Sequence, residues 1–370
     1  MRERYCAAQI RRDLARKMVF LGGARQVGKT TLAQRFIGKT GLYLNWDIAA
    51  HRERILRREW PTRAGLIVFD ELHKYRGWRN YLKGLYDEHR RYYQVLVTGS
   101  ARLDWYRYSG DSLQGRYHYL RMHPLSVAEL GGTSTALRDL LQYGGFPEPF
   151  FGQDTVEARR WSQEYRTRLL REEITTVEGV RDLGHLELLL LRLPDLVGSP
   201  LSINGLREDL QLNHKTVSRW LDIFERFYVF FRLAPFGTPK IKAVKKEQKH
   251  YHLDWSLVRD PGARFENLVA CHLRKWVDWQ VDTKGRAMEL RYVREVTGRE
   301  VDFVILEDQR PLQFIEVKRT ESPINPLLIT LKRKFPSSEA LQIHGEGRTA
   351  YRSPDGVQVQ PAIELLKTLV

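Results

Sequence analysis

The sequence contains few cysteines and lacks a long hydrophobic run. Only two cysteines, Cys6 and Cys271, occur in 370 residues, and their wide separation excludes a disulfide framework or a metal site of closely spaced cysteines. The longest apolar candidate, residues 186–193, is interrupted by Glu187 and Arg192, well short of the ~18 residues of a membrane span. These absences predict a protein of a reducing compartment with no membrane partner.

Repeats, low-complexity tracts and a recognisable secretion signal are also absent. Arg2, Arg4, Arg11 and Arg12 crowd the start of the chain, where a signal peptide would need an apolar core. We therefore expect a cytoplasmic location. Hydrophobic residues make up 42% of the chain and aromatic residues 11%, which suffices for packed cores. The length predicts two or three domains at about 150 residues each.

Charge of one sign is in excess, and the excess is uneven. The net charge is +16, with +9 in residues 1–60, +5 in residues 201–250 and only +1 in residues 251–370. A basic excess of this size indicates a polyanionic partner, and nucleic acid, above all DNA, is the first candidate. A solvated basic surface without a partner is the alternative.

One motif is complete and specific. Residues 23–30 have the pattern G-x-x-x-x-G-K-[ST], preceded by the apolar run 18–21 and followed by the helix-compatible run 31–37. A buried strand, a glycine loop and a helix N-terminus form a phosphate cradle, in which the lysine reaches the β- and γ-phosphates and the hydroxyl ligates Mg²⁺. We predict binding of ATP with Mg²⁺ by Gly23, Ala24, Arg25, Gln26, Val27, Gly28, Lys29, Thr30 and Thr31.

A second motif supplies the carboxylates of such a site. Four apolar residues, 66–69, end in Asp70 and Glu71, with a strand-like segment, 42–47, lying between this motif and the loop. A buried strand would bring Asp70 to the Mg²⁺ together with Thr30. Glu71 would polarise the attacking water as a general base. The pattern predicts hydrolysis of ATP with Glu71 and Lys29 as catalytic residues.

Two further residues are candidates for the same site. The run 94–98 predicts a third strand that ends near Ser100, where a hydroxyl could contact the γ-phosphate; Thr98 is the alternative, and a simple helix cap is the bland interpretation. Arg116 could act on a neighbouring subunit as an arginine finger. Arg121 is its alternative, and an internal salt bridge is equally compatible with the sequence. An arginine finger would require a homo-oligomer, of which a hexameric ring is one form.

These motifs together resemble a family. The loop, Phe69-Asp70-Glu71, Thr98-Gly99-Ser100 and the segments 113–116, 123–130 and 144–148 are similar to AAA+-type ATPases of bacteria and archaea that carry a C-terminal domain of uncharacterised function. The resemblance implies an α/β fold with three parts: a P-loop NTPase domain of AAA+ type (1–130), a helical and winged-helix region (131–250), and a restriction-endonuclease-like α/β domain (251–370).

The middle region has the order of elements of a winged helix. A short helix is predicted at 202–210, a longer one at 215–227, and a strand at 230–233. In that fold the second helix contacts DNA, and a supporting role without DNA contact is the alternative. The predicted DNA-binding residues are Lys215, Thr216, Ser218 and Arg219, together with Lys245 and Lys246 of a lysine-rich segment that would bind without sequence preference.

The C-terminal part carries a nuclease-like pattern. Asp302 and Glu316 lie fourteen residues apart on two predicted strands, Lys318 shares a face with Glu316, and Glu266 lies on an earlier helix. This arrangement resembles the PD-(D/E)XK pattern, in which Asp302 and Glu316 would hold Mg²⁺ and Lys318 would orient water. An exposed strand face without a metal is the alternative, because the region has almost no net positive charge.

The sequence therefore favours a Mg²⁺-dependent ATPase coupled to DNA binding or remodelling. One alternative is a nucleotide-controlled switch that binds a protein partner, with the C-terminal domain as an inactive scaffold. Another alternative is an ATP-gated DNA nuclease.

Overall fold

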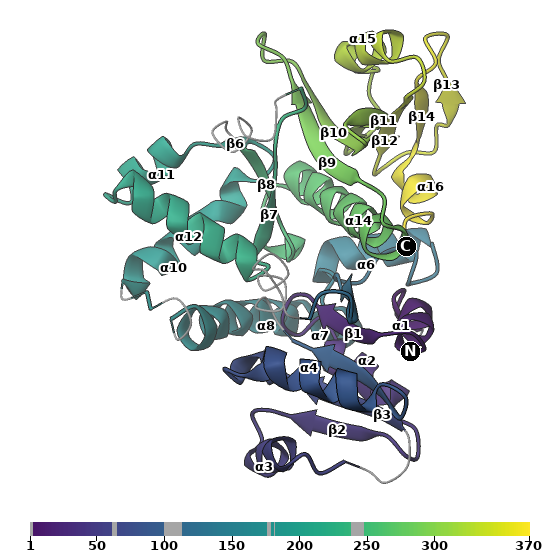
Figure 1. The fold of residues 1–370 in the computed structure, drawn as a ribbon. Coiled ribbons are helices and arrows are strands. Elements are labelled where there is room, and N and C mark those ends of the chain that lie inside the picture. The colour runs from purple at the N-terminus through teal and green to yellow at the C-terminus, as the bar shows by residue number, and fades with distance from the viewer. Residues whose placement is uncertain (1–2, 61–64, 100–112, 176–178, 181, 238–247) are drawn as a thin grey trace. The chain divides into compact units, whose positions relative to one another are not determined.

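The computed structural model describes residues 3–60, 65–99, 113–175, 179–180, 182–237 and 248–370 (Figure 1). By internal contacts the chain divides into two compact units, residues 1–124 with 226–228, and residues 125–225 with 229–370. The three domains expected from the sequence remain a prediction. Among helices of the described residues, none has both the length and the apolar character needed to cross a bilayer.

The first unit is built on a parallel five-stranded sheet with the order β2-β3-β4-β1-β5. Its strands β1, β3 and β4 are buried over most of their length, as expected for short and mainly apolar strands of a parallel sheet. The four strands expected at 18–21, 42–47, 66–69 and 94–98 are thus present. The strands are β1 (Met18–Gly22), β2 (Leu42–Asn45), β3 (Gly65–Asp70), β4 (Tyr93–Thr98) and β5 (Tyr117–Arg121).

One helix of this unit precedes the first strand, and the other three lie between strands in the sequence. The core includes Phe20, Phe69 and Leu82, with aromatic side chains such as Trp78 and Tyr81 packed around them. All strand connections return to the same edge of the sheet, as parallel pairing requires. The helices are α1 (Ala7–Leu14), α2 (Lys29–Phe36), α3 (Ala49–Arg57) and α4 (Trp78–His89), and a 3₁₀ turn, η1 (Leu72–Lys74), follows β3.

The second unit begins with helices and a helix–turn–helix segment. The helices expected at 202–210 and 215–227 are α11 (Ile203–Asp209) and α12 (His214–Arg226). A small antiparallel sheet of order β6-β8-β7 has one strand before these helices and two after them. The remaining elements are α6 (Ser134–Tyr143), α7 (Pro147–Gly152), α8 (Thr155–Arg168), the π-helical η3 (Leu169–Ile174), α10 (Leu183–Arg192), η4 (Leu193–Leu196), β6 (Pro200–Leu201), β7 (Phe230–Leu233), β8 (Gln248–His252) and η5 (Trp255–Leu257).

A mixed six-stranded sheet of order β13-β14-β12-β11-β10-β9 completes this unit. The long helix α14 packs against β9 and β11, and α15 packs against β10, β11 and β12 (Figure 1). The predicted strands at 300–305 and 311–318 are present. The elements are α14 (Pro261–Lys284), β9 (Met288–Arg294), β10 (Glu300–Glu307), β11 (Arg310–Lys318), α15 (Pro326–Lys334), β12 (Glu339–His344), β13 (Tyr351–Arg352), β14 (Gln358–Pro361) and α16 (Ala362–Leu366).

The segment 125–130 is fixed to α14 by buried polar contacts. The Val127 N–H donates to Nε2 of His272 at 3.0 Å, while Nδ1 of His272 lies 2.8 Å from the Leu268 carbonyl oxygen. Lys275 donates to the Ser126 hydroxyl at 2.9 Å and pairs with the Glu129 carboxylate. The motif His-Pro-Leu-Ser-Val-Ala-Glu-Leu thus contributes structural anchors to the second unit.

His272 predicts a pH dependence of stability. Burial, first of all, lowers the pKa of His272 to about 4, and the positive charge of Lys275 also lowers it. The unfolded chain binds a proton at His272 near pH 6.5, so the stability contributed by neutral His272 is present above pH 6.5 and lost as the pH falls towards 4. Unfolding free energy should fall by about 1.4 kcal/mol per pH unit in this window.

The variant His272→Gln isolates this contribution, because it removes the titrating group and retains a donor and an acceptor. Denaturant unfolding between about pH 4.5 and 7 should show a pH slope smaller than in the parent by about one proton. Identical slopes for the two proteins would show that His272 does not titrate between the folded and unfolded states.

Candidate functional site

The loop between β1 and α2 has a backbone that only glycine fits at two places. Gly23 has φ of 142°, and a Cβ there would lie 2.3 Å from the Met122 carbonyl oxygen. Gly28 has φ of 99° and immediately precedes the first residue of α2. Positive φ of this kind is strained for any residue with a side chain. The loop therefore keeps its backbone open towards the N-terminus of α2, as a phosphate cradle requires.

Lys29 lies inside this loop. Its side chain is buried, and Nζ donates to the carbonyl oxygens of Gly23 at 2.9 Å and Ala24 at 2.6 Å. A lysine ammonium held at the mouth of a helix N-terminus adds a full positive charge to the partial charge of the helix end. This arrangement favours an anion at the loop.

Asp70 joins three elements at the carboxyl edge of the sheet. Its Oδ2 accepts hydrogen bonds from the Thr30 hydroxyl at 2.8 Å and the Tyr43 hydroxyl at 2.7 Å, and Oδ1 accepts one from the Thr98 hydroxyl at 2.5 Å. Asp70 is only 4% exposed. Burial raises the pKa of Tyr43 above its ordinary value, and the bond to Asp70 adds to that effect, so the phenol keeps its proton and donates a hydrogen bond to the carboxylate.

Glu71 lies just beyond the strand in a left-handed conformation. Its φ is 57°, and its N–H donates to the Thr98 carbonyl oxygen at 3.0 Å. Its carboxylate lies 3.3 Å from Nζ of Lys74 and 3.6 Å from Nε2 of His73. Lys74 also pairs with Asp47 at 2.6 Å. A non-glycine residue at positive φ is costly, and such strain concentrates at functional sites.

The residues present fit a nucleotide with Mg²⁺. The loop can keep this path only with glycine at position 23, where a Cβ would clash with the Met122 carbonyl oxygen. The Thr30 and Asp70 oxygens, 2.8 Å apart, form a pair of hard ligands. Two contributors escaped the sequence analysis. Tyr43 donates a hydrogen bond to Asp70, and the Arg4 guanidinium donates to the Val27 carbonyl oxygen at 2.7 Å. In the sequence, the only signal for the Tyr43 contact was a polar residue on the strand next to β3.

The other residues predicted for this site have mixed outcomes. Ser100 lies outside the described residues, and its alternative, Thr98, contacts Asp70. Arg116 makes a two-point ion pair with Asp87 of the same chain, with Nε and Nη2 at 2.8 and 3.0 Å from the carboxylate oxygens. The salt-bridge alternative therefore describes Arg116 in the single chain, and its role as a trans finger remains a prediction.

Helix α12 presents a polar face opposite its buried one. Lys215 and Arg219, one helical turn apart, are exposed, while Val217 and Trp220 are buried. Thr216 and Ser218 are half-buried. Lys245 and Lys246 lie outside the described residues. The predicted DNA contacts of α12 are geometrically open, and they remain a prediction.

The C-terminal carboxylates lie together as the sequence predicted. The Asp302 N–H points to Glu316 Oε2 at 3.4 Å, and the Val317 N–H donates to Asp302 Oδ2 at 2.9 Å. Lys318 Nζ lies 2.6 Å from Glu316 Oε1. Pairing between β10 and β11 brings these side chains to one place on the sheet.

Lys249 of β8 was missed and changes the character of this cluster. Its ammonium is almost fully buried, 2.8 Å from Glu300 Oε2 and 3.9 Å from Asp302 Oδ1. Tyr251 of the same strand donates to Glu266 Oε1 at 2.7 Å. The signal was weak, because Lys249 ends a lysine-rich segment that appeared solvated.

Burial and mutual repulsion dominate the titration of these groups. Burial, followed by the negative charges of Glu266 and Glu316, raises the pKa of Asp302 well above its ordinary value. Burial likewise raises the pKa of Glu266. Burial alone would lower the pKa of Lys249, but the surrounding carboxylates outweigh it and raise that pKa. A charged lysine thus balances an acidic cluster.

These residues do not fit a resident divalent ion. Lys249 lies beside Asp302, and Lys318 pairs with Glu316, so each carboxylate of the predicted metal pair already has an ammonium neighbour. Within the described ranges no group of three or more His, Cys, Asp or Glu side chains is arranged to hold a metal. The metal role of Asp302 and Glu316 stays a prediction, and the geometry favours a cluster balanced by lysine.

Comparison with family models divides the chain into three matches. Residues 15–131 match the model of an AAA domain. Residues 134–260 and 261–364 match two domains of unknown function, DUF8612 and DUF4143. The first match contains the loop, Asp70, Glu71 and Thr98, and identifies the N-terminal part as an AAA-type P-loop domain.

Relatives cover most of the chain at low identity. The uncharacterized proteins Rv2008c of Mycobacterium tuberculosis and Mb2031c of Mycobacterium bovis are each 28% identical over 393 residues, covering 99% of this chain and 85% of the relative. An uncharacterized protein of Haemophilus influenzae is 23% identical over 322 residues, covering 77% of this chain and 78% of the relative.

Two solved structures are similar over part of the chain. The Aeropyrum pernix ORC1 protein in complex with DNA has 15% identity and a TM-score of 0.34, covering 72% of this chain and 92% of that one. The Bacillus subtilis DNA clamp loader delta protein (YqeN) has 11% identity and a TM-score of 0.31, covering 60% and 88%. Scores of this size support no further argument.

The three bonds to Asp70 predict a measurable cost of losing one hydroxyl. Thr98→Val keeps the shape of a fully buried side chain but removes a donor to a carboxylate, which should destabilise the protein by about 1.5–3 kcal/mol. The measurement is denaturant unfolding of the parent, Thr98→Val, Asp70→Asn and the double variant. Additive effects of the two substitutions would show that Thr98 and Asp70 are not coupled.

Proposed function

We propose that the protein is an AAA+-type ATPase that hydrolyses ATP with Mg²⁺. The carrying observation is the convergence of the loop lysine, Thr30 and Asp70 at one edge of a parallel sheet, with Thr30 and Asp70 oxygens 2.8 Å apart. The match of residues 15–131 to an AAA domain supports the same conclusion. Ligands of open parallel sheets bind at the carboxyl ends of the strands.

The residues of the chain divide the work. Backbone N–H groups after Gly23 and the N-terminus of α2 bind the phosphates, and Lys29 turns from loop carbonyls to phosphate oxygens. Thr30 and Asp70 would hold Mg²⁺, which would neutralise phosphate charge. Thr98 and Tyr43 hold the Asp70 carboxylate in place. The loop already has the backbone conformation for phosphate binding, so its glycines need not rearrange.

Glu71 accepts the proton of the attacking water. It directly follows the strand that carries Asp70, so its carboxylate lies beside the same edge of the sheet. Lys74 contacts this carboxylate at 3.3 Å and Asp47 at 2.6 Å. We infer that Lys74 orients Glu71, and that its shorter contact with Asp47 leaves Glu71 able to turn towards water.

We propose that this ATPase acts on DNA. Support comes from the net charge of +9 in residues 1–60 and from Lys215 and Arg219 on the exposed face of α12. Lysine and arginine side chains bind phosphates and make affinity depend on salt. Assembly into a homo-oligomer belongs to the proposal because Arg116, once released from Asp87, could reach a neighbouring site.

Two substitutions separate nucleotide binding from turnover. Lys29→Ala removes the positive charge at the loop and should abolish ATP binding, measured with a fluorescent ATP analogue. Glu71→Gln keeps the phosphate cradle and should bind ATP while losing turnover by roughly a hundredfold or more, measured as phosphate release.

The matched controls for these substitutions are Lys39→Ala and Glu53→Gln, at exposed positions of the same unit. Both controls should behave as the parent. Parent-like hydrolysis by Glu71→Gln would refute the assignment of the general base, and ATP binding by Lys29→Ala would refute the loop as the nucleotide site.

DNA should stimulate hydrolysis, and α12 should carry part of the effect. Turnover should rise with single-stranded or duplex DNA at low salt. Removing two phosphate contacts with Lys215→Gln/Arg219→Gln should weaken binding and lower the salt slope by roughly one to two. The control is Lys284→Gln/Arg310→Gln, which removes the same charge at exposed positions elsewhere in the unit. Turnover unaffected by any DNA at low salt would contradict the DNA proposal.

A further inference from the structure

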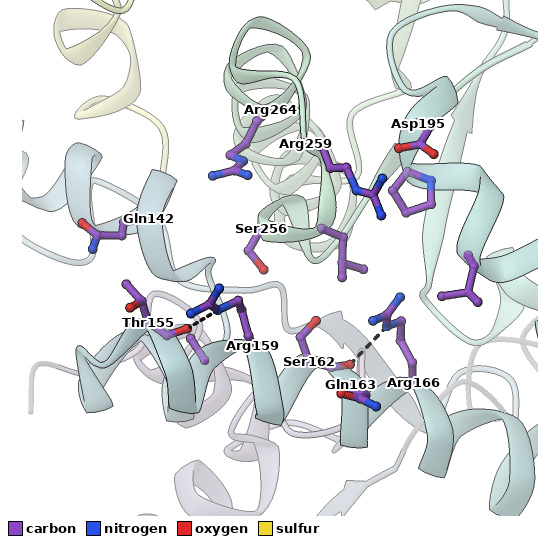
Figure 2. Close-up of a pocket in the computed structure, with 14 residues that line it drawn as sticks. Gln142, Thr155, Arg159, Ser162, Gln163, Arg166, Asp195, Ser256, Arg259 and Arg264 are labelled. Carbon is purple, nitrogen blue, oxygen red and sulfur yellow. Dashed lines mark hydrogen bonds between the residues drawn. The ribbon is translucent and has the colours of Figure 1, made fainter.

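A pocket of about 730 Å³ lies in the second unit, away from the carboxylate cluster. Its walls come from α8, from the end of α10 with η4, and from η5 with the start of α14. Figure 2 shows Arg159 and Arg166 on α8 at one side, with Arg259 and Arg264 on the opposite side. The volume lies within the range of about 300–1,000 Å³ that small-molecule and cofactor pockets occupy.

The arginines on α8 belong to a single stripe. Thr155, Arg159, Ser162 and Arg166 recur at intervals of three and four residues, so all four lie on one helix face. The Nε groups of Arg159 and Arg166 donate to backbone carbonyl oxygens of their own helix, those of Thr155 at 3.1 Å and Ser162 at 3.3 Å. These bonds fix the guanidinium stems and leave the outer nitrogens towards the pocket.

The four guanidinium groups lack carboxylate partners. Within the part of the chain that the structure describes, no Asp or Glu oxygen lies within 4.0 Å of Arg159, Arg166, Arg259 or Arg264. Elsewhere in the same unit arginines are paired, as Arg232 is with Glu225.

The acidic groups near the pocket are engaged elsewhere. The Asp195 carboxylate in the pocket wall lies 3.8 Å from Arg192, outside the pocket. Asp254, behind the wall, accepts the hydroxyls of Ser162 and Ser256 at 2.7 and 2.5 Å. Among the described residues that line the pocket, the single carboxylate of Asp195 thus faces four guanidinium groups.

Unpaired cations around one hollow repel one another, and an anion would relieve that repulsion. Burial lowers the pKa of Arg166, although Asp254 and Glu187 partly offset it, which shows that this guanidinium is already partly stripped of water. A planar guanidinium offers paired donors that match phosphate oxygens. Several such groups in one pocket match more than one phosphate charge.

We propose that this pocket binds a phosphate-bearing ligand of nucleotide size, with the four arginines as its phosphate ligands. Leu191, Pro194 and Leu257 add apolar wall, which suits the sugar and base that accompany phosphates. The phosphates come from a free nucleotide or from one stretch of a nucleic-acid strand. Nothing in this pocket requires the P-loop to hydrolyse ATP, so its ligand binding and the ATPase activity can fail separately.

The test uses the full chain with Lys29→Ala, which silences the P-loop. Two probes are titrated, inorganic tripolyphosphate and a fluorescent thymidine oligonucleotide of about 12 nucleotides. The test variant is Arg159→Gln/Arg166→Gln. The matched control is Arg160→Gln/Arg168→Gln, which removes the same charge from the same helix at positions outside the pocket wall.

We expect the test variant to weaken binding of at least one probe by about tenfold or more, while the control changes it by about twofold or less. For the oligonucleotide, the salt slope should also fall by roughly 1.4, since two phosphate contacts are lost. A loss confined to tripolyphosphate assigns a free phosphate ligand, and a loss confined to the oligonucleotide assigns a strand. Equal losses in test and control, or no loss for either probe, would overturn the proposal.

Stability is checked by thermal unfolding of each variant. If Arg159→Gln/Arg166→Gln unfolds early, Arg259→Gln replaces it, because the exposed Arg259 side chain makes no hydrogen bond with the described residues. That single change should weaken the same probe by several-fold, and parent-like binding of both probes would overturn the proposal equally.

Discussion

The Asp70 carboxylate is the interaction on which the N-terminal unit depends. In a parallel sheet every strand ends at the same edge, so a single acid on β3 can be reached from the loop after β1, from β2 and from β4. Thr30, Tyr43 and Thr98 each donate a hydroxyl to it. A buried carboxylate needs such donors, and the same requirement brings the phosphate loop and the acidic strand into register.

Sequence motifs predicted the arrangement of the P-loop and the Asp70 strand, because the chemistry of these motifs requires their residues to lie close together. Lys29, Thr30 and Asp70 must meet if the loop and the strand end are to serve one nucleotide. The strands around them are short apolar runs, whose length favours buried strands over helices. The partner of Arg116 could not be predicted, since Asp87 is one acid among many on exposed helices. Arg4 and Tyr43 also escaped notice, because no motif marks a residue that only supports another.

In the second unit, the alternation of side chains along a strand predicts some neighbours of a residue and misses others. Glu316 and Lys318 share a face because side chains repeat every two residues, and the pairing of β10 with β11 brings Asp302 to them. The sequence did not reveal that Lys249, from a strand outside this sheet, would be buried beside Glu300. A single sequence shows which residues carry charge, but only the fold shows which charges neutralise one another.

Charge balance therefore separates three groups of residues that look alike in sequence. At the C-terminal cluster the buried Lys249 and the half-exposed Lys318 already compensate the carboxylates, so an added cation would have to compete with them. At the P-loop Lys29 begins helix α2, and its ammonium donates to the carbonyl oxygens of Gly23 and Ala24. On α8 the arginines keep their stems bonded to backbone and their outer nitrogens without carboxylates. Positive charge held in fixed geometry favours the binding of phosphate. In the described residues the P-loop and the α8 pocket hold such charge, whereas the lysines of the carboxylate cluster are paired with Glu300 and Glu316.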